Sequence, residues 1–258
     1  MRTVASVPMN SRQFQDEIIQ NYLDLIEFAN GAPKESRWAA LRAEMGHPEP
    51  FGLEMIGVGN ENFGHSYKRR FLRIAEAIHA RYPEMRLVFT GGVVPYQFIL
   101  RPMNRFANKY NPAGFIDEHS YHSPEWLIRQ ADRYDNYKRG GTSIYVGEYA
   151  ANNELAMAKY DDEKANNYYS ALAEAAFLTG LERNGDVVGM SSYAPLFNLV
   201  DSTQWTHNLI DFNPAAVSRT ANYLVQQLFG GYYGDTYLKT QSVLPDGEAA
   251  SGFRECAL

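Results

Sequence analysis

The hydrophobic pattern of this chain switches repeatedly between an extended and a helical period, and this alternation limits the possible folds more than any other feature. Five short segments, apolar on both faces, have the pattern of strands buried between helices. They are residues 53–59, 86–92, 114–121, 143–150 and 186–195. Segments with apolar residues at helical spacing lie at 12–31, 66–83, 95–110, 123–139, 161–185 and 213–229. The alternation predicts an α/β fold with a parallel sheet covered by helices.

The composition restricts the classes of partner. The 258 residues are 45% hydrophobic and 14% aromatic, which is enough to bury a sizeable core. A formal net charge of −6 argues against nucleic acid and against an anionic membrane surface, because both attract basic patches. The single cysteine, Cys256, excludes an internal disulfide framework and a zinc site built from cysteines. An uncharged partner such as a carbohydrate fits these features better.

Two strands of the predicted sheet carry a carboxylate near their end, where functional groups gather in parallel α/β folds. Glu61 follows the first strand, and Glu148 lies at the end of the fourth. Between them, His119 and Tyr121 share one face of the third strand, because side chains alternate along a strand. Two carboxylates at one rim, with a histidine and a tyrosine beside them, are groups suited to cleavage of a glycosidic bond by a general acid and a nucleophile.

Each of these residues also has a structural interpretation. A glutamate at a strand end often caps the next helix or faces solvent, and a histidine often serves as a hydrogen-bonded core residue. A metal site formed by His119 and His122 is excluded, because residues three apart on a strand point to opposite faces. Glu118 points away from His119 for the same reason. The strand at 143–150 contains no G-x-S-x-G motif, so a serine nucleophile has no support.

Four longer segments, 46–64, 115–139, 143–152 and 191–213, together resemble the catalytic domain of the α-L-arabinofuranosidases of glycoside hydrolase family 51. The resemblance runs from about Asp16 to Tyr233. It implies a TIM-type (β/α)8 barrel over residues 1–230, present in part as strands four to eight with their helices. Residues 231–258 would then begin a C-terminal β-sandwich. Strands one to three would lie outside this chain, and the activity of the isolated chain is left open.

The resemblance also implies roles for individual residues. In that family the Glu of the Gly-Asn-Glu motif is the general acid/base and the Glu of the Gly-Glu-Tyr-Ala motif is the nucleophile, which implies these roles for Glu61 and Glu148. A retaining mechanism needs the two carboxyl groups about 5 to 5.5 Å apart, one protonated and one ionised. We expect Tyr121 to donate a hydrogen bond that stabilises the ionised Glu148. The residues with implied substrate contacts are Asn60, His119, Tyr121, Asn198 and Trp205.

The function implied by the resemblance is that of a retaining, exo-acting α-L-arabinofuranosidase. It releases terminal arabinofuranosyl residues from arabinose-containing polysaccharides or oligosaccharides, without a metal ion or an organic cofactor. Two alternatives stay open: an endo-β-glycanase of the same clan, and a non-catalytic carbohydrate-binding or assembly fragment. Neither nucleic acid nor a membrane is expected as a partner, whereas a homo-oligomer is left open. Localisation, cytoplasmic or secreted, is also open, because residues 1–13 lack the apolar core of a signal peptide and the N-terminus is expected to be incomplete.

Overall fold

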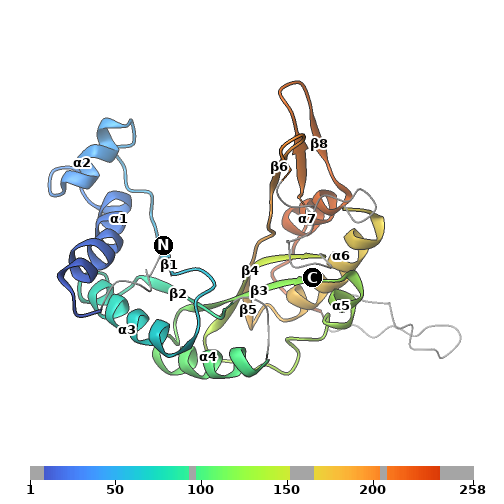
Figure 1. The fold of residues 1–258 in the computed structure, drawn as a ribbon, viewed down its shortest axis with the longest axis horizontal. Helices are drawn as coiled ribbons and strands as arrows, with labels where there is room; N and C mark the ends of the chain where they lie inside the picture. Colours follow the sequence, from blue (N-terminus) through green and yellow to red (C-terminus); the bar gives the residue numbers. More distant parts are fainter. Residues whose placement is uncertain (1–8, 93–96, 152–165, 204–207, 239–258) are drawn as a thin grey trace, which may run out of the picture. The chain divides into compact units, whose positions relative to one another are not determined.

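The structure of the protein is a computed structural model that describes residues 9–92, 97–151, 166–203 and 208–238 (Figure 1). Its contacts separate two compact units, Met1–Asp117 and Glu118–Leu258. The predicted boundary between a barrel domain, 1–230, and a β domain, 231–258, falls inside the second unit. Most of that β domain lies outside the described residues, so the division at residue 230 stays a prediction.

The first unit alternates helices and strands as the sequence predicts. Its elements are η1 (Phe14–Ile19, a π-helical turn), α1 (Gln20–Asn30), α2 (Arg37–Glu44), β1 (Met55–Val58), α3 (Gly64–Arg81), β2 (Arg86–Thr90), α4 (Gln97–Tyr110) and the first residues of β3 (Phe115–His122). Strands β1 and β2 pair in parallel, with Met55 opposite Arg86. Strand β2 pairs in parallel with β3, with Val88 opposite Phe115. The predicted parallel arrangement is therefore confirmed in this unit.

The core of the first unit contains a group of aromatic rings between the strands and the helices. Phe89, fully buried on β2, stacks on Tyr67 of α3 at 4.9 Å between ring centroids and on Phe106 of α4 at 5.2 Å. Phe71 of α3 meets the same ring edge to face at 4.8 Å. Aromatic side chains of this size contribute most of the apolar area that such a core removes from water. The core thus fixes α3 and α4 against the end of β2.

A buried arginine holds together the helical part of the first unit that precedes β1. Arg42 of α2 has no exposed surface and has no carboxylate among the hydrogen-bond partners described for it. Instead, its guanidinium donates to five backbone carbonyl groups, those of Phe28, Ala29, Gly31, His47 and Pro48, at 2.7 to 3.0 Å. The planar fork of an arginine can satisfy this many acceptors at once. It ties the end of α1 to the segment that follows α2.

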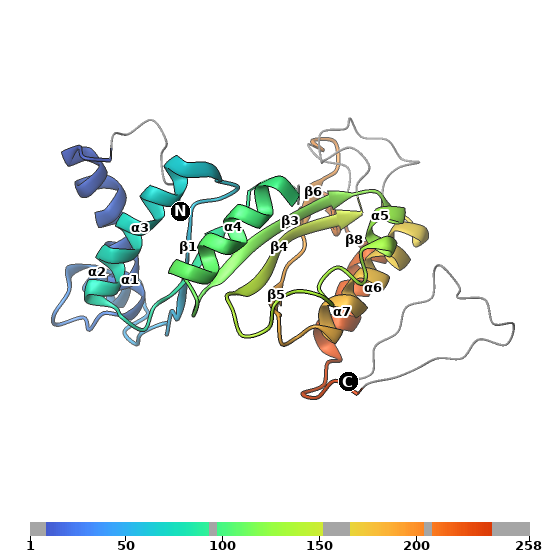
Figure 2. The ribbon, with the colours of Figure 1, turned by 90° about the horizontal axis from the view of Figure 1, so that it is seen from below.

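The second unit continues β3 and adds two further strands of the large sheet. Its other elements are α5 (Pro124–Arg129), β4 (Ser143–Ala151), α6 (Tyr168–Arg183), β5 (Val188–Ser191), β6 (Phe197–Leu199), β7 (Ile210–Phe212), β8 (Val217–Arg219) and α7 (Ala221–Gly231). The strand order is β1-β2-β3-β4-β5 in the large sheet and β6-β7-β8 in a small one. Strands β4 and β5 are parallel, and helices α6 and α7 lie side by side (Figures 1 and 2).

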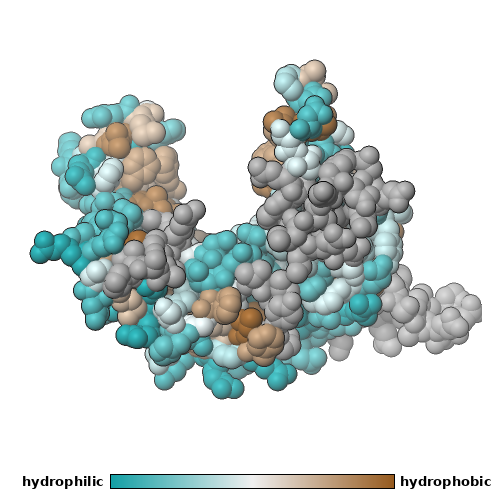
Figure 3. Space-filling view, viewed as in Figure 1, coloured by the Kyte–Doolittle hydropathy of each residue, from teal (hydrophilic) through white to brown (hydrophobic). Residues whose placement is uncertain are grey.

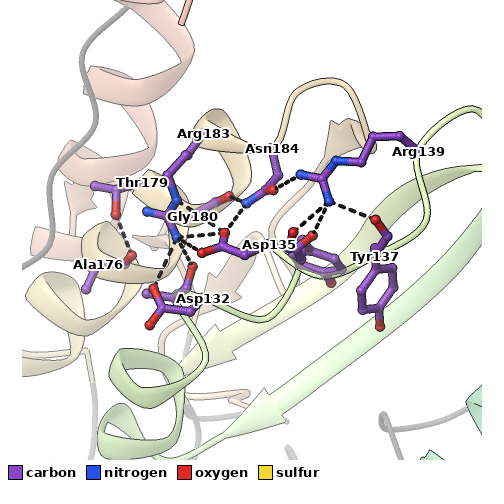
Figure 4. A network of polar contacts seen from close by, with 11 residues as sticks. Asp132, Asp135, Tyr137, Arg139, Ala176, Thr179, Gly180, Arg183 and Asn184 are labelled. Atoms are coloured by element: carbon purple, nitrogen blue, oxygen red, sulfur yellow. Dashed lines mark hydrogen bonds and ion pairs between the residues drawn. The ribbon is translucent and has the colours of Figure 1, made fainter. Parts of the chain in front are cut away.

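The helix predicted at 123–139 begins as expected but ends early. Ser123 caps α5 by accepting a hydrogen bond from the Trp126 amide, and the helix stops at Arg129. Two arginine side chains bind the backbone beyond it, one from another helix and one from the segment itself: Arg183 of α6 donates to the Ala131 carbonyl. Arg139 donates to three more carbonyls of this segment, those of Tyr134, Asp135 and Tyr137 (Figure 4). These bonds satisfy acceptors that a longer helix would have used, so the prediction was wrong beyond residue 129.

The prediction of a helix at 213–229 was wrong for its first turns. The structure begins α7 at Ala221, with the Thr220 hydroxyl accepting from the Tyr223 amide as the cap. The preceding residues form β8, which pairs antiparallel with β7. The Asn213 side chain accepts hydrogen bonds from the amides of Ala215 and Ala216, which builds the turn between the two strands. A local side-chain bond of this kind competes directly with helix formation.

The small β6-β7-β8 sheet is more exposed than the rest of the second unit. Phe197 is 65% exposed and Val217 is 71% exposed. Hydrophobic side chains are visible on this sheet among polar ones in Figure 3. The buried core of the unit lies instead between β4 and α6, where Val146, Tyr149 and Phe177 have no exposed surface. Within the described ranges, no helix is both long enough and apolar enough to cross a bilayer.

A fully buried carboxyl group, that of Glu174, lies between α6 and the end of β4. Its Oε1 accepts a hydrogen bond of 2.9 Å from the Ala151 amide. Burial raises the pKa of Glu174 from its ordinary value of 4.5 to about 7, and the Ala151 amide and the side chains of Asn222, Tyr193 and Gln226 offset part of this effect. The group is therefore protonated in the folded chain over a pH range in which it is ionised in the unfolded chain.

This difference predicts that protein stability depends on pH through Glu174. The folded pKa lies above the unfolded one, so the contribution is full below pH 4.5 and is lost as pH rises towards about 7. The shift corresponds to about 3 kcal/mol, at about 1.4 kcal/mol per pKa unit. We expect the free energy of unfolding of wild type, relative to Glu174→Gln, to fall by this amount between pH 4.5 and 8 in urea titrations. A difference that does not change with pH would contradict the prediction.

Candidate active site

The loop after β1 places Glu61 in an uncommon backbone conformation. Glu61 has φ +52°, in the left-handed region, where a residue with a Cβ atom pays a conformational cost. Such outliers persist only where the surrounding structure determines them, and they gather at functional sites. Gly59, two residues earlier, has φ +92°, and a Cβ atom there would lie 2.3 Å from Oδ1 of Asn62. The Gly-Asn-Glu sequence is thus matched to a tight turn that exposes part of the Glu61 side chain.

Two residues from neighbouring elements hold this loop. The Tyr67 hydroxyl of α3 donates to the Val58 carbonyl at 2.7 Å and accepts from the Thr90 amide at 2.8 Å. The Thr90 hydroxyl in turn donates to the Asn62 carbonyl at 2.5 Å. Neither Tyr67 nor Thr90 was predicted from the sequence to support this loop. The signal was available for Thr90, because the end of the second strand lies beside the end of the first in a parallel pair.

Glu148 is held by the two residues that the sequence places beside it. Its Oε2 accepts a hydrogen bond of 2.6 Å from the Tyr121 hydroxyl, so the predicted bond between these residues is confirmed. Nδ1 of His119 lies 3.3 Å from the same oxygen. The side chain of Glu148 is 27% exposed, whereas that of His119 is 2% exposed. The arrangement therefore presents an oriented carboxylate to solvent while its partners stay buried.

Glu148 lies near the end of β4, as the sequence pattern predicts. The predicted strand ends at residue 150, and β4 ends at Ala151, whose amide donates a hydrogen bond to Glu174 of α6. Glu148 thus projects from within a strand, which is a more rigid support than a loop.

The opposite face of β3 anchors the strand that carries His119 and Tyr121. Glu118, with no exposed surface, accepts hydrogen bonds from Arg133 and Tyr134 at 3.2 Å and from Tyr137 at 3.3 Å. Burial raises the pKa of both tyrosines, with the Glu118 charge as the second cause. The prediction that Glu118 points away from His119 is confirmed. The buried charge of Glu118 is paired with Arg133, as a buried charge must be.

The other predicted site residues are in different surroundings. Asn60 and Glu61 belong to the first unit, and their pairing with Glu148 stays a prediction. Asn198 lies on β6, where its buried amide donates to Asp211 of β7 at 2.7 Å. Its predicted substrate contact also stays a prediction. Trp205 lies outside the described residues.

Comparisons with known proteins relate most of the chain to one group of enzymes. A family described as "Alpha-L-arabinofuranosidase 1 domain" matches residues 3–139, and one described as "Alpha-L-arabinofuranosidase C-terminal domain" matches residues 147–252. An extracellular exo-α-L-arabinofuranosidase of Streptomyces chartreusis is 42% identical over 229 residues, covering 87% of this chain and 26% of the relative. α-L-Arabinofuranosidase 2 of Arabidopsis thaliana is 37% identical over 223 residues, covering 86% of this chain and 30% of the relative.

A solved structure extends the similarity to three dimensions. The arabinose-bound α-L-arabinofuranosidase MgGH51 matches with a TM-score of 0.75 and 36% sequence identity, over 92% of this chain and 37% of that one. An α-L-arabinofuranosidase of Thermotoga maritima, at 19% identity and a TM-score of 0.62, shares the fold. The present chain spans less than a third of the length of the two curated relatives.

Proposed function

Because the chain belongs to the α-L-arabinofuranosidases of glycoside hydrolase family 51, we propose that Glu148 and Glu61 are the nucleophile and the general acid/base of a retaining, exo-acting arabinofuranosidase. The proposed substrates are polysaccharides or oligosaccharides that carry terminal arabinofuranosyl residues. The observation that supports the proposal most directly is the 2.6 Å hydrogen bond from Tyr121 to Glu148, with His119 beside the same oxygen. A carboxylate that is oriented, stabilised as an anion and still accessible has the properties of a glycosidase nucleophile.

The proposed reaction proceeds in two steps. An oxygen of the Glu148 carboxylate forms a bond to the anomeric carbon while the glycosidic C–O bond breaks, and Glu61 gives its proton to the leaving oxygen. Water then attacks the anomeric carbon, Glu61 accepts a proton from that water, and Glu148 leaves as a carboxylate. The Tyr121 hydroxyl stabilises the Glu148 carboxylate before the first step and after the second.

The finer points of the fold belong to the same proposal. We infer that β1 to β5 correspond to strands four to eight of a (β/α)8 barrel, and that residues 231–258 begin a β-sandwich. The parallel pairings of β1 with β2, of β2 with β3 and of β4 with β5 support the first part. Asn60, His119, Tyr121, Asn198 and Trp205 are proposed to contact the sugar, with neither metal nor organic cofactor, and with neither nucleic acid nor membrane as partner.

A release assay tests the proposed function. The full chain is incubated with an aryl α-L-arabinofuranoside, with arabinoxylan, and with linear xylan and glucan. We expect release of the aryl group and of free arabinose, and no shortening of the linear chains. Shortened xylan or glucan chains would indicate an endo-β-glycanase instead. Binding of arabinose without any release, equally strong in Glu148→Ala, would indicate a non-catalytic carbohydrate-binding protein.

Removal of the Tyr121 hydroxyl is expected to lower kcat/KM but not to abolish activity. Tyr121→Phe keeps the buried ring but removes the hydrogen bond to Glu148. A hydrogen bond to a charged group is worth about 1.5–3 kcal/mol, so we expect kcat/KM for the aryl substrate to fall about 10- to 100-fold. Tyr137→Phe is the matched control, because it removes a tyrosine bond to Glu118 on the opposite face of β3. Equal losses in the two variants would contradict a specific role for Tyr121.

A further inference from the structure

The part of β4 that carries Glu148 lies beyond the regular pairing of this strand with β5. The parallel register runs from Ile144, opposite Val188, to Val146, opposite Ser191. After Val146 the strand is held towards the β5 side by separate bonds, of which the shortest joins the Ser192 hydroxyl to the Gly147 carbonyl at 2.6 Å. The position of Glu148 is therefore not set by the β4–β5 ladder alone.

Helices α6 and α7 also bond to this end of β4. Glu174 of α6 accepts a hydrogen bond of 2.9 Å from the amide of Ala151, three residues after Glu148. The hydroxyl of Tyr149, the residue directly after Glu148, donates to Oε1 of Gln226 in α7. Both Glu174 and Tyr149 are fully buried. Side-chain bonds from Ser192, Gln226 and Glu174 thus bracket Glu148 from one residue before it to three residues after it.

We propose that Glu174 is a positioning residue for Glu148: by holding the Ala151 amide, it fixes the end of β4 so that Glu148 meets Tyr121 and His119. This inference rests on the proposed function of Glu148. Glu174 itself touches no substrate, because its side chain is buried behind the strand.

The chemistry of the buried group supports this role. Burying a carboxyl group costs free energy that an apolar side chain would not, so holding α6 against the sheet does not require a glutamate. Apolar contact is non-directional, whereas a hydrogen bond fixes the distance and angle of the strand amide. The ionisable groups that face Glu174 are Tyr149 of β4 and Tyr193 after β5, and the amides of Asn222 and Gln226 face it from α7. Tyrosines and amides leave Glu174 with neutral neighbours at ordinary pH.

The test compares three variants of the full chain. Glu174→Ala removes the acceptor for Ala151, Glu174→Gln keeps an oxygen acceptor, and Ser170→Ala is the matched control. Ser170 is buried on the same helix and bonds to Asn222 of α7, and the bonds described for it do not reach β4. For each variant, kcat and KM are measured with an aryl α-L-arabinofuranoside, Tm is measured, and hydrogen exchange of the Ala151 amide is followed by NMR.

For Glu174→Ala we expect kcat to fall about 10- to 100-fold with KM within about threefold, the size of effect that a displaced reacting group produces. The Ala151 amide should exchange rapidly in this variant. Glu174→Gln should keep kcat within about threefold of wild type and keep the amide protected, and Ser170→Ala should lower Tm without lowering kcat. The inference is overturned if Glu174→Ala lowers Tm as Ser170→Ala does but leaves kcat intact. If wild type shows no turnover, the proposed function fails, and unchanged protection of Ala151 in Glu174→Ala would then refute the positional role separately.

Discussion

Replacement of Glu148 by alanine is expected to abolish turnover of arabinofuranosides while leaving the chain folded. The side chain of Glu148 is partly exposed, but its loss removes the acceptor of the buried Tyr121 hydroxyl, so we expect a cost in stability of about 1–3 kcal/mol that leaves the fold intact. Without the carboxylate no glycosyl-enzyme bond can form, and we expect kcat to fall by a factor of about 10³ or more. The measurement is the rate of aryl α-L-arabinofuranoside hydrolysis, with circular dichroism to verify the fold. Glu125→Ala, which removes an exposed carboxylate of α5, is the control.

Added azide distinguishes the role of Glu148 from that of Glu61. In Glu148→Ala it can occupy the space of the missing carboxylate and attack the anomeric carbon directly, which gives a glycosyl azide of inverted configuration. In Glu61→Ala the nucleophile is intact, and the loss falls mainly on substrates whose leaving group needs a proton. We therefore expect hydrolysis of arabinoxylan to suffer far more than hydrolysis of an activated aryl glycoside. Full activity of both variants on arabinoxylan would show that the assignment of the pair is wrong.

Replacement of Arg42 by alanine is expected to destabilise the first unit strongly. The substitution removes the donor of five backbone carbonyl groups, of which the Ala29 carbonyl is buried and the other four are partly buried, and it leaves a cavity where the fully buried side chain lay. Buried groups left without a partner cost about 1–3 kcal/mol each before relaxation, so we expect a loss of about 3–5 kcal/mol in the free energy of unfolding.

Urea titration measures this loss of stability. Two further variants test whether it comes from the hydrogen bonds of Arg42. Arg42→Lys keeps the charge but offers three donors in place of the five of a guanidinium, so it should recover only part of the stability. Arg37→Ala is the matched control on the same helix, because Arg37 is exposed and lies over the Trp38 ring at 4.6 Å. It should cost less than about 1 kcal/mol. A loss below about 1 kcal/mol in Arg42→Ala would contradict the structural role of this arginine.

The elements of the candidate site could be predicted from the sequence to different degrees. Side-chain alternation along β3 places His119 and Tyr121 on one face and Glu118 on the other, and the hydrogen bonds of all three residues agree with it. The bond from Tyr121 to Glu148 was expected from the family resemblance, which implies that Glu148 is an ionised nucleophile in need of a hydrogen-bond donor. The residues that support the site, Tyr67, Thr90 and Glu174, did not follow, because each of them bonds to a backbone group 23 or 28 residues away in sequence.

Local pattern determined by itself the type and order of the main helices and strands, since periods of 2 and 3.6 residues report directly which faces are buried. It also predicted the start of α5 at Ser123, because an N-terminal cap depends on a few neighbouring residues. Only the tertiary structure decided where elements stop and what stabilises them. Arg183, about 50 residues away in sequence, binds a carbonyl of the backbone that follows α5, and Glu174 binds the amide of the last residue of β4. The physical reason is that a backbone carbonyl or amide accepts any partner of suitable geometry, and no spacing in the sequence records which one reaches it.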